Sequence, residues 1–487
     1  MKLKTLTLAV GAALGTLAAS SVFAAGLLPT DYNATTTQDF YVSGASAQDN
    51  GILGMARALC LAGTMSHYAV SNNNIYFCSP DVGAGTGQIN LTGGKTKMAI
   101  YKYSVGGSGS GIAPVANGSA LPFLDLTKLT VGVGGNCVTV APDFTDTALP
   151  AYTKYSCAGS NITTNQVTKI GFSDVEPEFF APAATTALLT KKSVTSLIFG
   201  IPVSLKVRNK LQAYQGKTVG GETEADMPSL TSAQLTTIYT QAGQTWSGIG
   251  YPMNVAVGST AALADDGIYV ARRVNSSGTQ KTFEALAARS GNGEGFKSCS
   301  VNTDPFVNSP NDTVGEPFAT ACGTAVASTV FAGSGGSDVR NCLITHDANG
   351  RGAVGVITTE EKPGAAAWRF VAIDGVAPTQ RNTASGAYRL YTENTFQYKS
   401  ATNVGNYALL ISKFASDLNN PVVIAQLDSA YTQTWGRGGL LALVSNQAAP
   451  NPVVITTDAA VAASPINPWT KITASGLNNC QNPKLFN

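Results

Sequence analysis

The sequence predicts an α/β protein, in which strands alternate with helices along the chain. Short apolar runs typical of buried strands are followed by turns rich in Ser and Gly and then by segments with helical periodicity. The clearest case is the apolar run at 267–271, which a turn at 272–280 joins to a helix-like run at 281–288. No repeated segment interrupts this alternation.

Strands are predicted where apolar, β-branched and aromatic residues gather in short runs, and helices where apolar residues recur at a spacing of three or four. The predicted strands are 38–42, 98–101, 169–172, 196–205, 267–271 and 353–357, and 386–391 is expected as a return crossing between lobes. The predicted helices are the segment that carries Ile52, Met55, Ala56 and Leu59, the capped run 230–239, the run 281–288, and the segment 408–414.

The first 24 residues have the three parts of a secretory signal peptide. Lys2 and Lys4 form a basic start, an apolar segment follows at 6–17, and a small-x-small cleavage sequence ends at Ala24. No other apolar run approaches the length of a bilayer span. We therefore expect an exported protein, periplasmic or extracellular.

Charge and composition exclude one large class of function. Charged residues make up 12% of the chain, about half the usual share, and the net charge is +2 without a basic block. Nucleic-acid binding needs a concentrated basic face, so the sequence argues against it. Hydrophobic residues make up 44%, which is enough for a large core in two or three domains. We expect a monomer.

Eight cysteines in an exported chain predict disulfides rather than metal ligands. Two local pairs are predicted, Cys60 with Cys78 and Cys137 with Cys157. The remaining four allow three connectivities, which the sequence leaves open: Cys299, Cys322, Cys342 and Cys480. None of the eight forms a CxxC and the chain has 2 histidines, so no zinc site is expected.

Two stretches have weak periodicity. Residues 113–165 are rich in Gly, Thr and Pro, and we interpret them as an insertion closed by the pair Cys137 and Cys157. A second loop-rich stretch runs over 290–340. The segment 346–350 has the start of a calcium loop, but the remaining ligands of that pattern are missing, so no metal is predicted there.

The turn at 272–280 carries the strongest functional signal. Ser277, Gly278 and Thr279 stand at the start of a predicted helix, where the first backbone N–H groups lack partners and the dipole favours an anion. Arg273, four residues before Ser277, offers a planar fork to a tetrahedral oxyanion. Alone, the tripeptide is more often just the cap of a surface helix.

Three further turns also lie next to predicted strands or helices: 43–47, 108–111 and the pair Ser173-Asp174. In open α/β sheets, ligands collect at the carboxyl ends of strands. Each turn alone is more often a cap or a linker. Together, in this order and in an exported chain, the four turns predict a cage of hydroxyl and N–H groups around an arginine.

The order and content of these turns resemble the phosphate-binding proteins of ABC phosphate importers, which are two-lobed periplasmic proteins. The similar stretches are 44–46 (the family's Gly-Ala-Gly-Ala-Thr-like turn), 107–111 (Gly-Ser-Ser-Gly), 173–177 (Ser-Asp-x-Pro, here with one extra residue), 273–279 (Arg-x-Asp-x-Ser-Gly-Thr) and 199–203 (the crossing strand). The resemblance is spread over residues 40–395, and these short stretches match closely.

The resemblance implies a two-lobed, type II periplasmic-binding-protein architecture with disulfide-bearing insertions. It implies phosphate as the ligand, an ABC permease in the inner membrane as partner, and no cofactor. Carried over by position, it implies seven ligand-binding residues: Ser46, Ser108, Asp174, Arg273, Ser277, Gly278 and Thr279.

Two departures from the family pattern matter. Asn275 stands where the family has an Asp that pairs with the arginine, and we expect this to leave Arg273 more available. The cystine-bearing insertion between Ser108 and Asp174 lies where it can crowd the cleft.

The lobe boundaries follow from the two predicted crossings, near 199–202 and 388–391. After the signal peptide, lobe 1 comprises 26–200 and includes the insertion. Lobe 2 comprises 201–387, and 388–487 returns to lobe 1 and continues into a C-terminal segment.

The leading functional hypothesis is an exported, non-enzymatic substrate-binding protein that captures phosphate, or a similar tetrahedral oxyanion, for uptake. One alternative is a secreted phosphatase-like hydrolase on the same scaffold, which would need a nucleophile with a base or a metal cluster. Another is a surface or matrix protein that has kept the lobes and lost the ligand.

Overall fold

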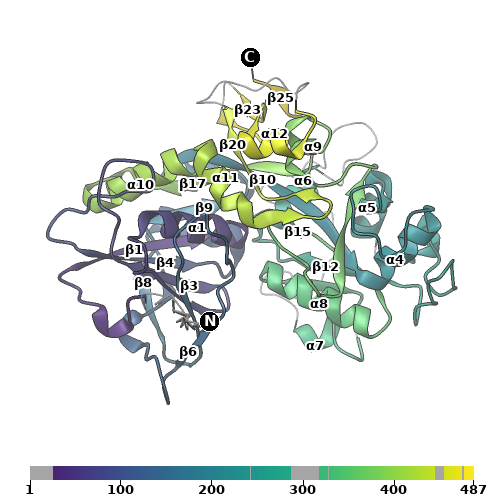
Figure 1. Cartoon of the computed structure of the whole chain (residues 1–487), viewed down its shortest axis with the longest axis horizontal. Helices are drawn as coiled ribbons and strands as arrows, with labels where there is room; N and C mark the ends of the chain where they lie inside the picture. Colours follow the sequence, from purple (N-terminus) through teal and green to yellow (C-terminus); the bar gives the residue numbers. More distant parts are fainter. Residues whose placement is uncertain are drawn as a thin grey trace, which may run out of the picture.

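The computed structural model describes residues 26–241, 243–286, 317–326, 328–444, 455–473 and 476–486. The predicted signal peptide and Cys299 lie outside these residues. Figure 1 shows two masses side by side, with the purple and blue N-terminal elements in one and the teal and green elements in the other. The yellow C-terminal elements lie across the top of both. We call the first mass lobe 1 and the second lobe 2.

The sheet of lobe 1 is mixed. Its strands are ordered β6-β7-β2-β3-β4-β1-β9-β17-β10-β20-β21, and the central trio β4, β1 and β9 is parallel. The bounds are β1 Thr37–Gly44, β2 Ser66–Val70, β3 Asn73–Cys78, β4 Lys97–Tyr103, β6 Cys137–Val140, β7 Thr153–Cys157, β9 Ile170–Ser173, β17 Tyr391–Tyr398, β20 Leu440–Leu443 and β21 Ile466–Asn467. A small hairpin of β5 (Ala120–Leu124) and β8 (Thr163–Val167) lies beside it.

The sheet of lobe 2 is ordered β13-β12-β14-β10-β16-β11. Its parallel trio is β13, β12 and β14, so the carboxyl ends of these strands meet at one edge. The bounds are β11 Ser229–Leu230, β12 Ile268–Arg273, β13 Val330–Gly333, β14 Gly352–Gly355, β15 Ile357–Thr358 and β16 Trp368–Ile373.

One long strand belongs to both sheets. The first part of β10 (Thr190–Ser204) pairs with β17 and β20 of lobe 1, and the change comes at Phe199 and Gly200, which pair with β15. From Ile201 onward β10 pairs with β14 and β16 of lobe 2. The strand therefore joins the lobes at the segment where the sequence predicts a crossing.

Helices cover both sheets. They are α1 Asp49–Leu59, α2 Ala113–Asn117, α3 Ala183–Thr186, α4 Leu205–Tyr214, α5 Ser232–Thr240, α6 Gly278–Leu286, α7 Phe318–Ala321, α8 Gly336–Ala348, α9 Gln380–Ala384, α10 Gly405–Asp417, α11 Pro421–Asp428 and α12 Asp458–Ala463. Among the described residues, no helix is both long and apolar enough to cross a bilayer.

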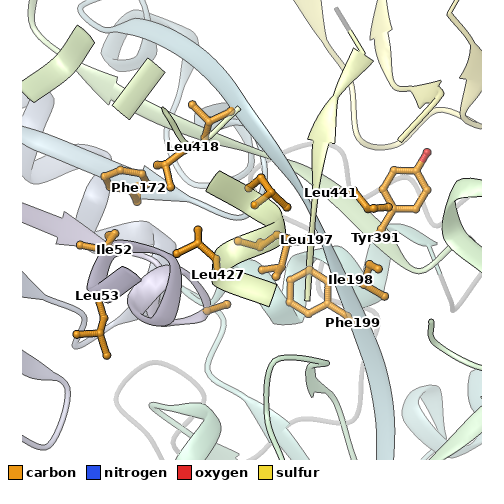
Figure 2. Packing of buried hydrophobic residues seen from close by; sticks show 14 of the residues in the cluster. Ile52, Leu53, Phe172, Leu197, Ile198, Phe199, Tyr391, Leu418, Leu427 and Leu441 are labelled. Atoms are coloured by element: carbon orange, nitrogen blue, oxygen red, sulfur yellow. The ribbon is translucent and has the colours of Figure 1, made fainter. Parts of the chain in front are cut away.

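The largest core continues from one lobe to the other along β10. Figure 2 shows Leu197, Ile198 and Phe199 of this strand packed near Leu427 of α11 and Leu441 of β20. All five are buried. Because burying a large apolar side chain stabilises by roughly 1.5–3 kcal/mol, this shared core holds the crossing strand in place.

The stretch 113–165, interpreted from the sequence as an insertion, contains strands of lobe 1. Its strand β7 pairs in parallel with β2, and β6 pairs with β7, so the stretch extends the sheet of lobe 1. The hairpin of β2 and β3, which supplies this edge, is missed by sequence analysis. Its turn carries Ser71 at a φ of 50°, a left-handed conformation outside the usual glycine signal.

Strand β17 begins at Tyr391, within the segment 388–391 where the return crossing is expected. Gly386 follows helix α9 at a φ of 83°, which is the left-handed turn that ends many helices. The predicted loop at 290–340 also contains α7 and β13 in its described part, and 346–350 includes the end of α8.

Disulfides join Cys60 to Cys78 and Cys137 to Cys157, so the two local pairs are confirmed. A third bond joins Cys322 to Cys342 on lobe 2, and Cys480 is also disulfide-bonded. Closing a loop of about 20 residues stabilises a fold by roughly 3 kcal/mol.

Candidate anion-binding site

The parallel strands of lobe 1 deliver three of the predicted residues to one edge of the sheet. Strand β1 leads into the 3₁₀ turn η2 (Ser46–Gln48), β4 leads to η3 (Gly107–Gly111), and β9 leads directly to Asp174. Because neighbouring parallel strands end at the same edge, Ser46, Ser108 and Asp174 converge. The backbone N–H of Asp174 donates to Ser108 Oγ at 3.1 Å.

Lobe 2 supplies the arginine and a helix start. Arg273 ends β12, and helix α6 begins five residues later at Gly278. The guanidinium of Arg273 donates from Nη2 to the carbonyl of Ser334 at 2.7 Å and from Nε to the carbonyl of Gly333 at 3.2 Å. With these contacts made, the remaining N–H groups of the guanidinium point toward lobe 1.

Three hydrogen bonds join the lobes at this edge. Arg273 Nη2 donates to Ser46 Oγ at 3.2 Å, and the backbone N–H of Gly109 donates to the carbonyl of Ser276 at 2.9 Å. The hydroxyl of Thr279 donates to Asp174 Oδ2 at 3.4 Å. The structure is therefore in a closed arrangement, with the turns of both lobes in contact.

The contact is tight enough to require glycine at position 278. A Cβ atom there would lie 2.2 Å from Ser108 Oγ and 2.6 Å from the Cβ of Asp174. Ser277, next to it, lies against Gly107 of lobe 1. The structure thus brings all seven predicted residues together, and their role as ligand contacts stays a prediction.

Asp174 is buried, with 1% of its surface exposed, and one of its oxygens is unsatisfied. In the described part of the chain, neither Oδ1 nor the amide nitrogen of Gln48 has a partner within 3.5 Å. Burial raises the pKa of Asp174 to about 6, although the positive charge of Arg273, a longer hydrogen bond from the Gln48 side chain and the charge of Lys102 oppose this rise. Buried polar atoms with weak or missing partners are rare, so this pair is a candidate position for a ligand contact.

Lys102 is a site residue that sequence analysis missed. It lies in the apolar-looking strand β4 and is completely buried. Its Nζ contacts Asp49 Oδ1 at 3.0 Å and donates to the carbonyl of Gly44 at 2.9 Å and to Ser104 Oγ at 2.6 Å. The sequence feature that could have identified it is a lysine within a mostly apolar strand. Lys102 adds a second positive charge behind the cage.

Asn275, which stands where the family has an Asp paired with the arginine, contacts Arg272. Its Oδ1 accepts a hydrogen bond from Arg272 Nη2 at 2.5 Å. Successive side chains of a strand point to opposite faces, so Arg272 and Arg273 project apart. Arg273 is nevertheless held by the carbonyls of Gly333 and Ser334 rather than left free.

An open cleft of about 220 Å³ adjoins the cage. Three predicted residues line it, Ser46, Arg273 and Thr279, while Ser108, Asp174, Ser277 and Gly278 lie behind them. The insertion borders this cleft through Asp143 and Lys154, as its position in the sequence suggested.

The described residues contain one group with the composition of a metal site, Cys322, Cys342 and His346. The two sulfurs of this group are bonded to each other, so they are not thiolate ligands.

The chain resembles known proteins in structure but not in sequence. No family model and no curated protein sequence matches the chain. The solved structures that resemble it include a Clostridium perfringens protein described as a phosphate ABC transporter substrate-binding protein with bound phosphate. It is 14% identical, with a TM-score of 0.42, over 80% of this chain and 98% of that one.

Two others are similar in the same way. An ABC-type phosphate transport receptor from Vibrio cholerae is 18% identical, with a TM-score of 0.31, over 55% of this chain and 80% of that one. A possible phosphate binding protein from Planctomyces limnophilus is 12% identical, with a TM-score of 0.35, over 82% of this chain and 92% of that one. The function is therefore inferred from the geometry of the site itself.

Proposed function

We propose that this chain is a substrate-binding protein that captures phosphate, or a similar tetrahedral oxyanion, between its two lobes. The observation that carries the proposal is the buried carboxylate of Asp174, whose Oδ1 has no partner within 3.5 Å among the residues that the structure describes, beside Arg273 and the start of helix α6. These groups come from both lobes, so a ligand that binds all of them favours closure.

A carboxylate suits an anion site when the ligand carries a proton. Phosphate near neutral pH keeps at least one O–H, and an ionised carboxylate only accepts hydrogen bonds. Asp174 Oδ1 is therefore matched to that O–H. Arg273 and the N–H groups at the start of α6 supply the donors for the remaining oxygens.

The protein is proposed to be a binder and not a hydrolase. A covalent hydrolase needs a nucleophile within hydrogen-bond reach of a base. His67 Nε2 is paired with the amide of Asn74 at 2.9 Å, and the ring of His346 packs against Tyr269 with centroids 4.6 Å apart. Neither histidine pairs with a serine in the described residues.

Export, delivery to an ABC permease, and the lobe boundaries at residues 200 and 388 belong to the same proposal. The change of partners along β10 at Phe199 and Gly200 supports a hinge there. A few residues at the end of an element are enough to absorb such a motion.

The test is calorimetry on mature protein that has been unfolded, freed of carried-over phosphate and refolded. The proposal expects saturable binding of one phosphate per chain, and no release of phosphate from a chromogenic phosphate ester. Absence of binding would favour the surface or matrix protein. Steady turnover of the ester would favour the hydrolase.

A further inference from the structure

The cleft beside the cage is larger than a tetrahedral oxyanion requires. Its volume of about 220 Å³ is more than ten times the roughly 15 Å³ that one water needs. The lobes are already in contact through Arg273 and Ser46, so this space remains when the turns have met. The extra room is therefore part of the closed site.

The far wall of this cleft carries a buried acceptor without a partner. His67, on strand β2, is 4% exposed, and its Nε2 lies 2.9 Å from Asn74 Oδ1. Because the amide oxygen accepts, the ring proton is assigned to Nε2, and Nδ1 is left as an acceptor. Nδ1 has no hydrogen-bond partner among the described residues.

A second acceptor lies close to the first. Asp143 Oδ2 is 3.9 Å from His67 Nδ1, too far for a hydrogen bond. Burial lowers the pKa of His67 to about 4, so at neutral pH the ring carries no proton for the carboxylate. The other oxygen of Asp143 is paired with Lys154 Nζ, which balances its charge. His67 Nδ1 and Asp143 Oδ2 are thus two facing acceptors in a region without net charge. A hydroxyl group of a ligand can donate a hydrogen bond to one of them.

We infer that the ligand of this cleft is a phosphate monoester of a polyhydroxylated molecule, of the sugar-phosphate class, whose phosphate lies toward Arg273 and Thr279 and whose hydroxyls reach His67 and Asp143. The inference rests on the proposed function and narrows its substrate.

The test compares three ligands on the unmodified protein by calorimetry: inorganic phosphate, glucose 6-phosphate, and hexyl phosphate, which has the same charged group and no hydroxyls. We expect glucose 6-phosphate to bind at least about tenfold more tightly than hexyl phosphate, since one lost hydrogen bond to a buried group costs about 1–3 kcal/mol.

The variant His67→Phe removes the acceptor and keeps a ring against Tyr76, whose centroid lies 4.9 Å away. We expect it to bring glucose 6-phosphate to within about threefold of hexyl phosphate and to leave phosphate affinity within about twofold. His346→Phe, on lobe 2 against Tyr269, is the matched control and should change none of the three.

The outcomes separate the inference from the proposed function. Binding of phosphate without preference for glucose 6-phosphate over hexyl phosphate overturns the inference and leaves phosphate capture standing. Failure of all three ligands to bind overturns both. If His67→Phe folds poorly, the comparison of the three ligands on the parent protein still tests the inference.

Discussion

The guanidinium Nη2 of Arg273 lies 3.2 Å from the hydroxyl oxygen of Ser46, and this hydrogen bond joins the end of β12 in lobe 2 to the turn after β1 in lobe 1. Arg273 is 2% exposed. The proposed anion ligand of Arg273 would therefore lie where the two lobes meet.

Replacing Arg273 with alanine is expected to weaken phosphate binding by at least about a hundredfold. Removing one partner of a buried charge pair costs roughly 3–5 kcal/mol, and about 1.4 kcal/mol is a factor of ten. Calorimetric titration of the variant measures the loss.

The control for this experiment is the exposed Arg389→Ala, which removes one positive charge from the surface. Arg272 is unsuitable, because it is completely buried and bonded to Asn275. Equal losses in Arg273→Ala and Arg389→Ala would mean that net charge, and not the site, governs binding.

Gly278→Ala is expected to hold the lobes apart. The new Cβ would meet Ser108 Oγ at 2.2 Å, and that atom belongs to the other lobe. We expect phosphate affinity to fall at least about tenfold, because the closed state is the one that binds. Gly51→Ala in helix α1 is the control, since its Cβ meets nothing closer than 3.6 Å. A variant Gly278→Ala that binds like the parent would show that these turns do not meet in the complex.

The ionisation of Asp174 should be visible in the stability of the ligand-free protein. Its pKa is raised from 3.8 to about 6, so the folded state holds the proton more tightly than the unfolded state does. The parent therefore loses stability as the pH rises from 4 to about 7, and Asp174→Asn escapes this loss.

Denaturant unfolding of both proteins at pH 4 and pH 7 measures the effect. The unfolding free energy of Asp174→Asn relative to the parent should rise by about 2 kcal/mol between the two pH values, because the folded-state pKa is about 6 and the unfolded one 3.8. A relative stability that does not change with pH would contradict a buried, titrating carboxyl.

Ligand should also change the shape of the molecule. If β10 contains the hinge, small-angle scattering should give a smaller radius of gyration with phosphate than without it. The variant Arg273→Ala is the control, because it should show no change at the same phosphate concentration. An unchanged radius in the parent would indicate a rigid scaffold.

The crossing and the four turns can be predicted from the sequence because their signals are local. A Gly and a Pro inside an apolar run mark β10, and Ser277 with Gly278 marks a helix start. Tertiary features were beyond sequence analysis. The β2 and β3 hairpin has no glycine turn, and Lys102 is explained only by Asp49, which lies 53 positions away and is bonded to it at 3.0 Å.

The sequence predicts which residues form the site, but it does not predict which of them hydrogen-bond to one another. Asn275 is expected to leave Arg273 without a carboxylate partner, and the sequence does not predict the hydrogen bond that Asn275 accepts from Arg272, three positions earlier. The sequence does not single out His67 as a site residue, because an isolated histidine in a strand is more often a core residue. Its importance comes from the distance of 3.9 Å to Asp143, which belongs to a distant part of the chain.

Asp174 and Arg273 are proposed to hold a protonated oxyanion between the lobes. The ratio of the affinities for phosphate and sulfate measures whether they do. Sulfate has no proton and would set a lone pair against the carboxylate, and sites built on one hydrogen bond reject such analogues by about 10⁴ or more. Calorimetry should show strong preference for phosphate in the parent and a much smaller one in Asp174→Asn, whose amide can donate to either anion. Equal affinity for the two anions in the parent, or a ratio that the substitution leaves unchanged, would contradict the account.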